Sequence, residues 1–237
     1  MQRRQFNQTG VSAIGALILA IHHQAHALSL GDLSSISNQD ASKGLKTALE
    51  KSAVAAIALL GKPDGFLKNP KVRIPLPGYL EAASSFLKNF GQSQRIDELV
   101  TAINRAAEAA IPLGQDMLVS AVRNMNVNDA KNILAGGETS VTSFFIEKTR
   151  TPLGLTFLPI VIKATEKVGL VHQYNEFAGK AASFGLVKKD DANIQQYVTG
   201  KALDGLFVVI GDEEKKIRQD PVATGSEILM KVFGSKK

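Results

Sequence analysis

Apolar residues recur every three or four positions through most of the chain, which is the period of an amphipathic α-helix. Residues 38–60 are the clearest case, because five apolar side chains share one helical face before Gly61 interrupts the pattern (positions 45, 49, 53, 57 and 60). The same spacing predicts further helices at residues 78–90, 96–111, 126–136, 152–167, 192–218 and 226–233. Only residues 71–76 alternate in the manner of a strand, and the prolines there argue against one. We therefore predict an all-α fold, a single-domain bundle of several helices with one proline-rich extended segment.

Capping residues set several of these helix boundaries. Pro112 should kink the helix that precedes it or begin a new one, because proline has no N–H to donate within a helix. The stretch from Asn126 to Asp129 has the form of a capping box. Thr151 followed by Pro152 predicts a cap and a first-turn proline at the start of the next helix.

One stretch between predicted helices is stiff and basic: GKPDGFLKNPKVRIPLP, residues 61–77, which we call the strap. It holds four of the chain's eight prolines, four cations and one acid. Proline fixes φ and pushes the preceding residue toward extended conformations, so we expect residues 69–76 to be extended. Asp64-Gly65 is most simply a turn.

Alternate side chains of an extended segment face opposite ways, so the strap has two registers. In one register the apolar residues face the helices and the cations face outward (Val72, Ile74 and Leu76 against Lys71 and Arg73). In the other, Arg73 points at carboxylates of the bundle. The structural interpretation of the strap is a well-packed surface segment. The functional alternative is the wall of a cleft, with Lys71 and Arg73 presented to an anion.

Two glutamates interrupt the apolar face of the long helix predicted at residues 192–218. On a helical wheel Glu213 and Glu214 lie one on each side of the apolar stripe, between Ile210 and Ile217. A buried carboxylate needs a cation, a metal or hydrogen-bond donors, because its desolvation is otherwise costly. We therefore expect at least one of the two to be buried and held by a cation.

The helix predicted at residues 96–111 repeats this feature. Asn104 and Glu108 lie one turn apart at the edge of its apolar face, and Arg105 points away. Two interpretations stay open. The functional one joins Glu108 with the two glutamates of the later helix in one polar site. The structural one pairs each carboxylate with a cation across a helix interface. For the two glutamates of the later helix the candidate cations are Lys71, Arg73 and Arg105, with Arg105 the least favoured because of its outward angle.

The first 27 residues have the features of a cleaved export signal: Arg3 and Arg4, a largely apolar stretch at 11–21, and the small-x-small sequence Ala25-His26-Ala27. Eleven helical residues span about 16 Å against roughly 30 Å of hydrocarbon, too short for a membrane anchor. The start Arg3-Arg4-Gln5-Phe6 resembles the twin-arginine signal, and both that route and the general secretory route stay open. We predict a mature domain of residues 28–237 in the periplasm, with no transmembrane segment after cleavage.

Composition narrows the chemistry further. The absence of cysteine excludes disulfides, thiolate nucleophiles and zinc–cysteine sites. Beyond residue 27, His172 is the only histidine, and we expect it on a helix surface. No phosphate-binding loop, dinucleotide fingerprint, zinc-protease motif or calcium loop is present, so we predict no cofactor and no metal site. The cations form no arginine-rich block, and we expect no nucleic acid partner.

Four stretches carry a resemblance to a known family: ALLGKPDGFLKNPKVRIPLP (58–77), INRAAEAAIP (103–112), NDAKNILAGG (128–137) and KALDGLFVVIGDEEKKIRQDP (201–221). Together they resemble a family of exported bacterial proteins catalogued only as a domain of unknown function, from about Ser37 to Phe233. The resemblance implies an exported helical domain. It implies no activity, substrate or catalytic residue.

These observations predict a periplasmic helical protein that binds a small molecule or a protein partner, or serves a structural role, without catalysis. The alternative is a hydrolase that uses Glu108, Glu213 or Glu214 as acid and base, with or without a metal. Carboxylate pairs carry out such chemistry when their environments separate their pKa values. Carboxylates that converge in an open pocket would favour the enzyme, whereas carboxylates closed off by cations would favour the binding or structural protein.

Overall fold

The structure is a computed structural model that describes residues 38–78, 80–81, 93–136, 139–183, 185, 192–224, 226–227 and 229–230. Every regular element within these ranges is helical, and none of them contains a strand, which confirms the all-α prediction. The predicted export signal lies outside the described residues, as do most of the helix predicted at 78–90 and half of the one predicted at 226–233. The elements are α2 (Asn38–Leu60), α4 (Ser93–Ala110), η2 (Ile111–Gly114), α5 (Gln115–Arg123), α6 (Val127–Ala135), α7 (Ser140–Thr165), α8 (Gly169–Ser183), α9 (Ile194–Gln219) and η4 (Val222–Thr224).

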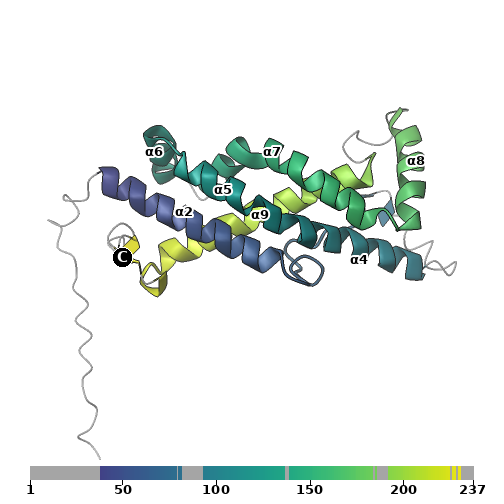
Figure 1. Cartoon of the computed structure of the whole chain (residues 1–237), viewed down its shortest axis with the longest axis horizontal. Helices are drawn as coiled ribbons and strands as arrows, with labels where there is room; N and C mark the ends of the chain where they lie inside the picture. The colour runs from purple at the N-terminus through teal and green to yellow at the C-terminus, as the bar shows by residue number, and fades with distance from the viewer. Residues whose placement is uncertain are drawn as a thin grey trace, which may run out of the picture.

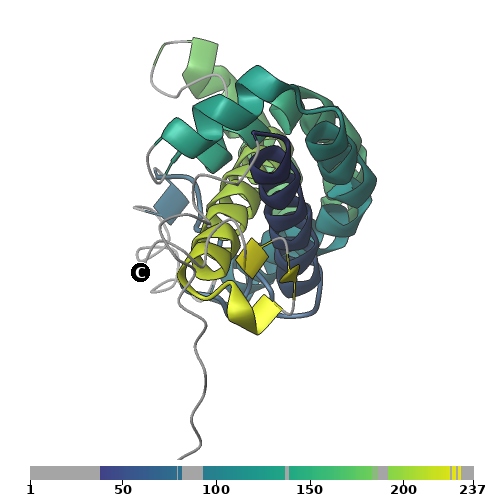
Figure 2. The ribbon, with the colours of Figure 1, turned by 90° about the vertical axis from the view of Figure 1, so that its left-hand side faces the viewer.

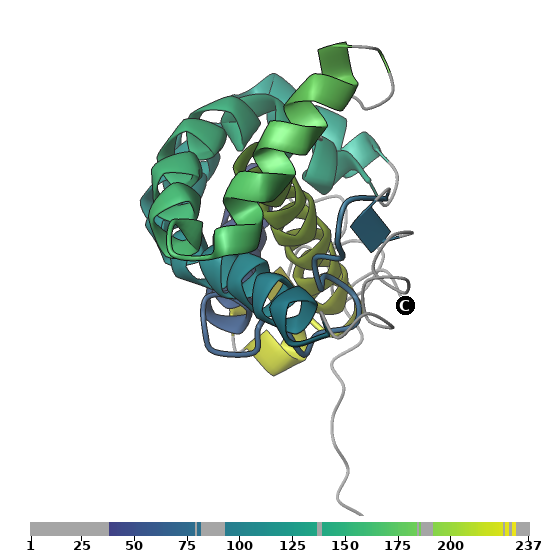
Figure 3. The ribbon, with the colours of Figure 1, turned by 90° about the vertical axis from the view of Figure 1, so that its right-hand side faces the viewer.

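The bundle is organised around α9, which packs most extensively against α7 and α2 (Figure 1). Seen end-on, α2 and α9 lie side by side, and α5 and α7 curve over them (Figure 2). The opposite end is covered by α8, which crosses the ends of the longer helices and contacts α4 and α9 (Figure 3). None of the helices in the described ranges is both long and apolar enough to cross a membrane.

Several predicted boundaries are confirmed. Helix α2 spans the 38–60 segment whose apolar face was evident in the sequence. Helix α4 ends at Ala110, and Pro112 lies in the first turn of the 3-10 helix η2, which separates α4 from α5. Asn126 and Asp129 form the capping box at the start of α6, where each side chain accepts a hydrogen bond from the other residue's backbone N–H, at 2.8 and 3.1 Å. Helices α5 and α8 were not predicted.

The predicted helix start at Thr151-Pro152 is wrong. Helix α7 runs through Pro152 and continues through Pro159. Both prolines are exposed, so water can reach the carbonyls that lose their helical partner on that side. The helix is held by an unbroken series of buried residues at intervals of four: Val141, Phe145, Thr149, Leu153, Phe157, Val161 and Thr165. Burial along that whole length offsets the cost of proline, which is roughly 3 kcal/mol in a helix interior.

Candidate functional site

The strap passes over the bundle between α4 and α9. Its largest apolar side chain, Phe66, is fully buried, and Ile74 is 1% exposed. The aromatic ring of Phe66 and the side chain of Val72 lie against Gly205 of α9. Further along, the hydroxyl of Tyr197 donates to the carbonyl of Pro75 at 3.2 Å. The strap therefore contacts α9 along several helical turns.

The prediction that residues 69–76 are extended is correct only in part. Residues 70–72 form a turn, whereas residues 73–77 have no hydrogen-bonded turn or helix. Asn69 causes the difference: its side-chain oxygen accepts from the N–H of Lys71 at 3.1 Å, and its carbonyl accepts from Arg73 at 2.8 Å. An asparagine followed by proline favours turn initiation for this reason. The turn predicted at Asp64-Gly65 is confirmed, with Asp64 at φ 69°.

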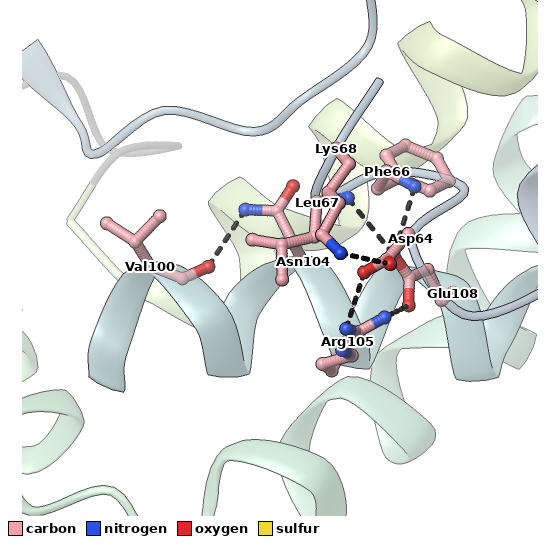
Figure 4. A network of polar contacts seen from close by, with 8 residues as sticks. All are labelled: Asp64, Phe66, Leu67, Lys68, Val100, Asn104, Arg105 and Glu108. Atoms are coloured by element: carbon pink, nitrogen blue, oxygen red, sulfur yellow. Dashed lines mark hydrogen bonds and ion pairs between the residues drawn. The ribbon is translucent and has the colours of Figure 1, made fainter. Parts of the chain in front are cut away.

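Glu108 fixes the first half of the strap to α4 (Figure 4). Its side chain is buried, and one carboxylate oxygen, Oε1, accepts hydrogen bonds from the backbone N–H groups of Phe66 and Leu67, both at 3.0 Å. The other oxygen, Oε2, accepts from a guanidinium nitrogen of Arg105 at 2.7 Å. Both oxygens of this carboxylate are therefore occupied by groups of the chain itself.

Arg105 extends this network toward the surface. The prediction that it points away from the polar residues is wrong, because its long side chain turns back to Glu108 and reaches Asp64 at 2.6 Å. Asp64 also pairs with Lys68 at 2.9 Å. Hydrogen bonds from Lys68 and then from Arg105 hold the pKa of the Asp64 carboxyl below its usual range. The pKa of Arg105 is raised by its hydrogen bonds to Glu108 and then Asp64.

Asn104 fixes the second half of the strap. Its side-chain oxygen accepts from the N–H of Ile74 at 2.8 Å, and its amide nitrogen donates to the Ile74 carbonyl at 3.0 Å. The same nitrogen donates to the carbonyl of Val100 at 2.8 Å (Figure 4). The buried amide thus replaces the neighbouring strand that an extended residue would otherwise pair with.

The burial pattern decides between the two registers of the strap. The apolar residues are buried and the cations are exposed, as in the first register (Val72, Ile74 and Leu76 against Lys71 and Arg73). Arg73 is therefore not directed at the buried carboxylates. Lys71 forms an ion pair with Asp212 of α9, a residue that the helical wheel placed on the solvent side.

The two glutamates of α9 differ in burial. We expected at least one of them to be buried. Glu214 is 5% exposed and pairs with Arg218, four residues later on the same helix. Glu213 is less buried and pairs with Lys216 at 2.6 Å. The expectation of a buried glutamate held by a cation is confirmed, but the candidate cations Lys71, Arg73 and Arg105 are wrong. A wheel shows which face a residue occupies and cannot show that its partner lies one turn along the same helix.

The predicted site residues thus lie in separate networks. Among the residues that the structure describes, no hydrogen bond or ion pair joins Glu108 to Glu213 or Glu214. Nor do three potential ligands gather to hold a metal ion within the described ranges. His172 is exposed on α8, which confirms the expectation of a histidine on a helix surface. Glu108 and Asn104 are two clamps that position the strap.

The residues that complete these networks were not predicted from the sequence. Asp64 was interpreted only as part of a turn, although its place beside four cations in the strap was a signal of pairing. Arg218 stands four residues after Glu214, the spacing of a helical ion pair, and could have been found from that spacing alone. No sequence pattern indicated that two amides of the strap would meet Glu108.

Comparison with known proteins gives one result. The family model described as "Protein of unknown function (DUF4197)" matches residues 35–234. Searches of the curated proteins and of the solved structures gave no significant match. The match covers the strap, both clamps and all the helices that the structure describes.

Proposed function

We propose that this chain, which belongs to DUF4197, a family of proteins of unknown function, is a non-catalytic binding or structural protein of the periplasm. The proposal rests on the residues themselves, because membership of the family implies no activity. The strap is its binding surface. The α4 clamps hold this surface in one conformation, so little conformational entropy is lost when a partner binds.

The observation that carries this proposal is the saturation of the clamps. Glu108 accepts from two backbone amides and from Arg105, and Asn104 makes three hydrogen bonds. A general acid or base has to reach a substrate proton within hydrogen-bond distance. Carboxylates already occupied by the chain support a role in positioning the strap, and no contact among the residues that the structure describes favours the hydrolase alternative.

Purification from the native host, with mass spectrometry of what co-purifies, tests the binding role. The chain with Asn104→Ala serves as the comparison, because it loosens the strap without altering a surface side chain. We expect a molecule or protein that is recovered with the wild-type chain and lost with the variant. Recovery of the same set with both would contradict a role for the strap. Turnover of a recovered molecule that Glu108→Gln abolishes without lowering the melting temperature would favour the hydrolase instead.

The periplasmic location rests on the pattern of residues 1–27, the charged start, short apolar stretch and Ala25-His26-Ala27. N-terminal sequencing of the protein from the periplasmic fraction should begin at Leu28. Protein that carries an intact residue 1 in a host with working export would contradict this part of the proposal.

A further inference from the structure

The outer side of the strap is a cationic surface. Its four cations are all exposed: Lys62, Lys68, Lys71 and Arg73. Lys68 and Lys71 are partly neutralised, by Asp64 and Asp212. The side chains of Lys62 and Arg73 make no hydrogen bond or ion pair with any part of the chain that the structure describes. Positive charge therefore remains available at both ends of this segment.

The backbone that carries these cations is fixed from below. Glu108 holds Phe66 and Leu67, Asn104 holds Ile74, and Tyr197 holds the carbonyl of Pro75. A flexible basic loop would lose conformational freedom on binding an anion. Here most of that ordering is already present in the free protein, which favours association.

The strap offers little to a peptide that would pair with its backbone. The N–H and C=O of Ile74 are both used by Asn104, and Pro70, Pro75 and Pro77 have no N–H. Strand addition depends on such groups. Recognition is left to the cationic side chains, and the guanidinium of Arg73 can hold a phosphate with two parallel hydrogen bonds.

We propose that the outer side of the strap binds a membrane surface through anionic phospholipid headgroups. The proposal rests on the proposed function, in which the strap is a binding surface, and it names the partner. The four cations are exposed and spread over residues 62–73, so they can contact several phosphates at separate positions. A bilayer with anionic lipids presents such an array, and basic side chains near it are attracted additively.

Vesicle co-sedimentation with the full chain tests this proposal. One set of vesicles is phosphatidylcholine alone, and the other contains phosphatidylcholine and phosphatidylglycerol in equal parts. We expect binding to the phosphatidylglycerol vesicles that weakens as salt is added, because exposed charges are screened. The double variant Lys62→Ser, Arg73→Ser should bind these vesicles about 25-fold more weakly, at about fivefold for each cation.

The matched control is Lys43→Ser, Lys163→Ser, which removes the same charge from exposed side chains on α2 and α7 away from the strap. Residues 1–27, with their own arginines, are identical in all three proteins and cannot cause a difference between them. The control should bind phosphatidylglycerol vesicles within about twofold of wild type, since these cations lie off the proposed surface. The two removed strap side chains make no ion pair in the described residues, so the melting temperatures should agree.

Three outcomes would overturn the proposal. They are equal binding to both kinds of vesicle, an equal loss in the two double variants, and wild-type binding by the strap variant. A polyglutamate peptide that binds the wild-type chain and not the strap variant, where vesicles do not bind, would identify an acidic protein as the partner instead. That result would leave the proposed function standing, whereas a native partner that ignores Asn104→Ala would contradict both.

Discussion

Helices α4 and α9 each bury a carboxylate at the edge of an apolar face, and they hold it in different ways. Glu108 of α4 accepts from the amides of Phe66 and Leu67, 42 and 41 residues earlier in the chain. Glu214 of α9 is held by Arg218 on its own helix. The two carboxylates are similarly buried, but they differ in how far along the sequence their partners lie. The first carboxylate connects distant parts of the chain, whereas the second pair would form in any conformation that keeps α9 helical.

This difference predicts unequal costs for the same substitution. Glu108→Ala leaves two backbone N–H groups without an acceptor, one of them buried, and should lower the free energy of unfolding by roughly 3–5 kcal/mol. Glu214→Ala leaves Arg218, which is partly exposed and can turn toward water. We expect roughly 1–2 kcal/mol for that change. Chemical denaturation of the two variants measures both values.

Glu108→Gln serves as the control for this pair. Glutamine keeps an oxygen for the amides of the strap and loses the charge that Arg105 meets, so its cost should lie between wild type and Glu108→Ala. Equal losses for Glu108→Ala and Glu214→Ala would show that the range of the contacts does not matter.

The strap itself separates buried from exposed contributions. Ile74→Ala should destabilise the protein by roughly 2–4 kcal/mol, because it removes a side chain packed in the core beside the Asn104 clamp. Lys71→Ala breaks the pair with Asp212, in which both side chains are partly exposed, and should cost under about 1 kcal/mol. Denaturation midpoints that barely move for either variant would show that the strap is a loose loop.

Much of the fold was evident in the sequence because its signals are local. Helical periodicity placed α2 and α9, and the capping box at Asn126 placed the start of α6. The error at Pro152 arose because the sequence rule for proline is local too, whereas the continuity of α7 depends on packing along its whole length. Its buried residues repeat every four positions, a spacing that drifts by about 40° per step around a helix and so reaches several neighbours in turn.

The candidate site was less accessible to prediction. Wheels identified Asn104, Glu108 and Glu214 as residues at a buried edge, and the structure buries all three. They could not identify partners, since the amides of Phe66 and Leu67 carry no side-chain signal at all. Any residue type offers the same backbone N–H, so contacts of this kind are set by the path of the chain alone.

The packing of the strap against α9 can be tested by substitutions in the helix. A methyl group at Gly205 would lie 2.9 Å from the ring of Phe66 and 3.2 Å from Val72, so Gly205→Ala should destabilise the protein by roughly 1–2 kcal/mol. A methyl group added at Gly200, on the same helix, would meet no neighbouring atom within 4 Å. Gly200→Ala should therefore raise the stability by up to about 1 kcal/mol, as alanine does in a helix interior. Melting temperatures that rise for both variants would mean that Phe66 does not pack against Gly205.

The smallest expected effect concerns pH and the outer end of the Glu108 network. Hydrogen bonds from Lys68 and Arg105 lower the pKa of Asp64 in the folded chain from a usual value of 3.8. The folded state thus binds this proton less tightly than the unfolded state does, so the contribution of Asp64 is complete above the unfolded pKa. It is lost as the pH falls through the folded pKa.

Asp64→Asn removes the charge and keeps a residue that tolerates the positive φ found there. The variant should melt slightly below wild type at neutral pH, because these ion pairs are partly exposed and so partly screened by water. The difference should close below about pH 4. Melting curves of both proteins across that range check this, and a difference that persists unchanged into strong acid would mean that the Asp64 charge does not stabilise the strap.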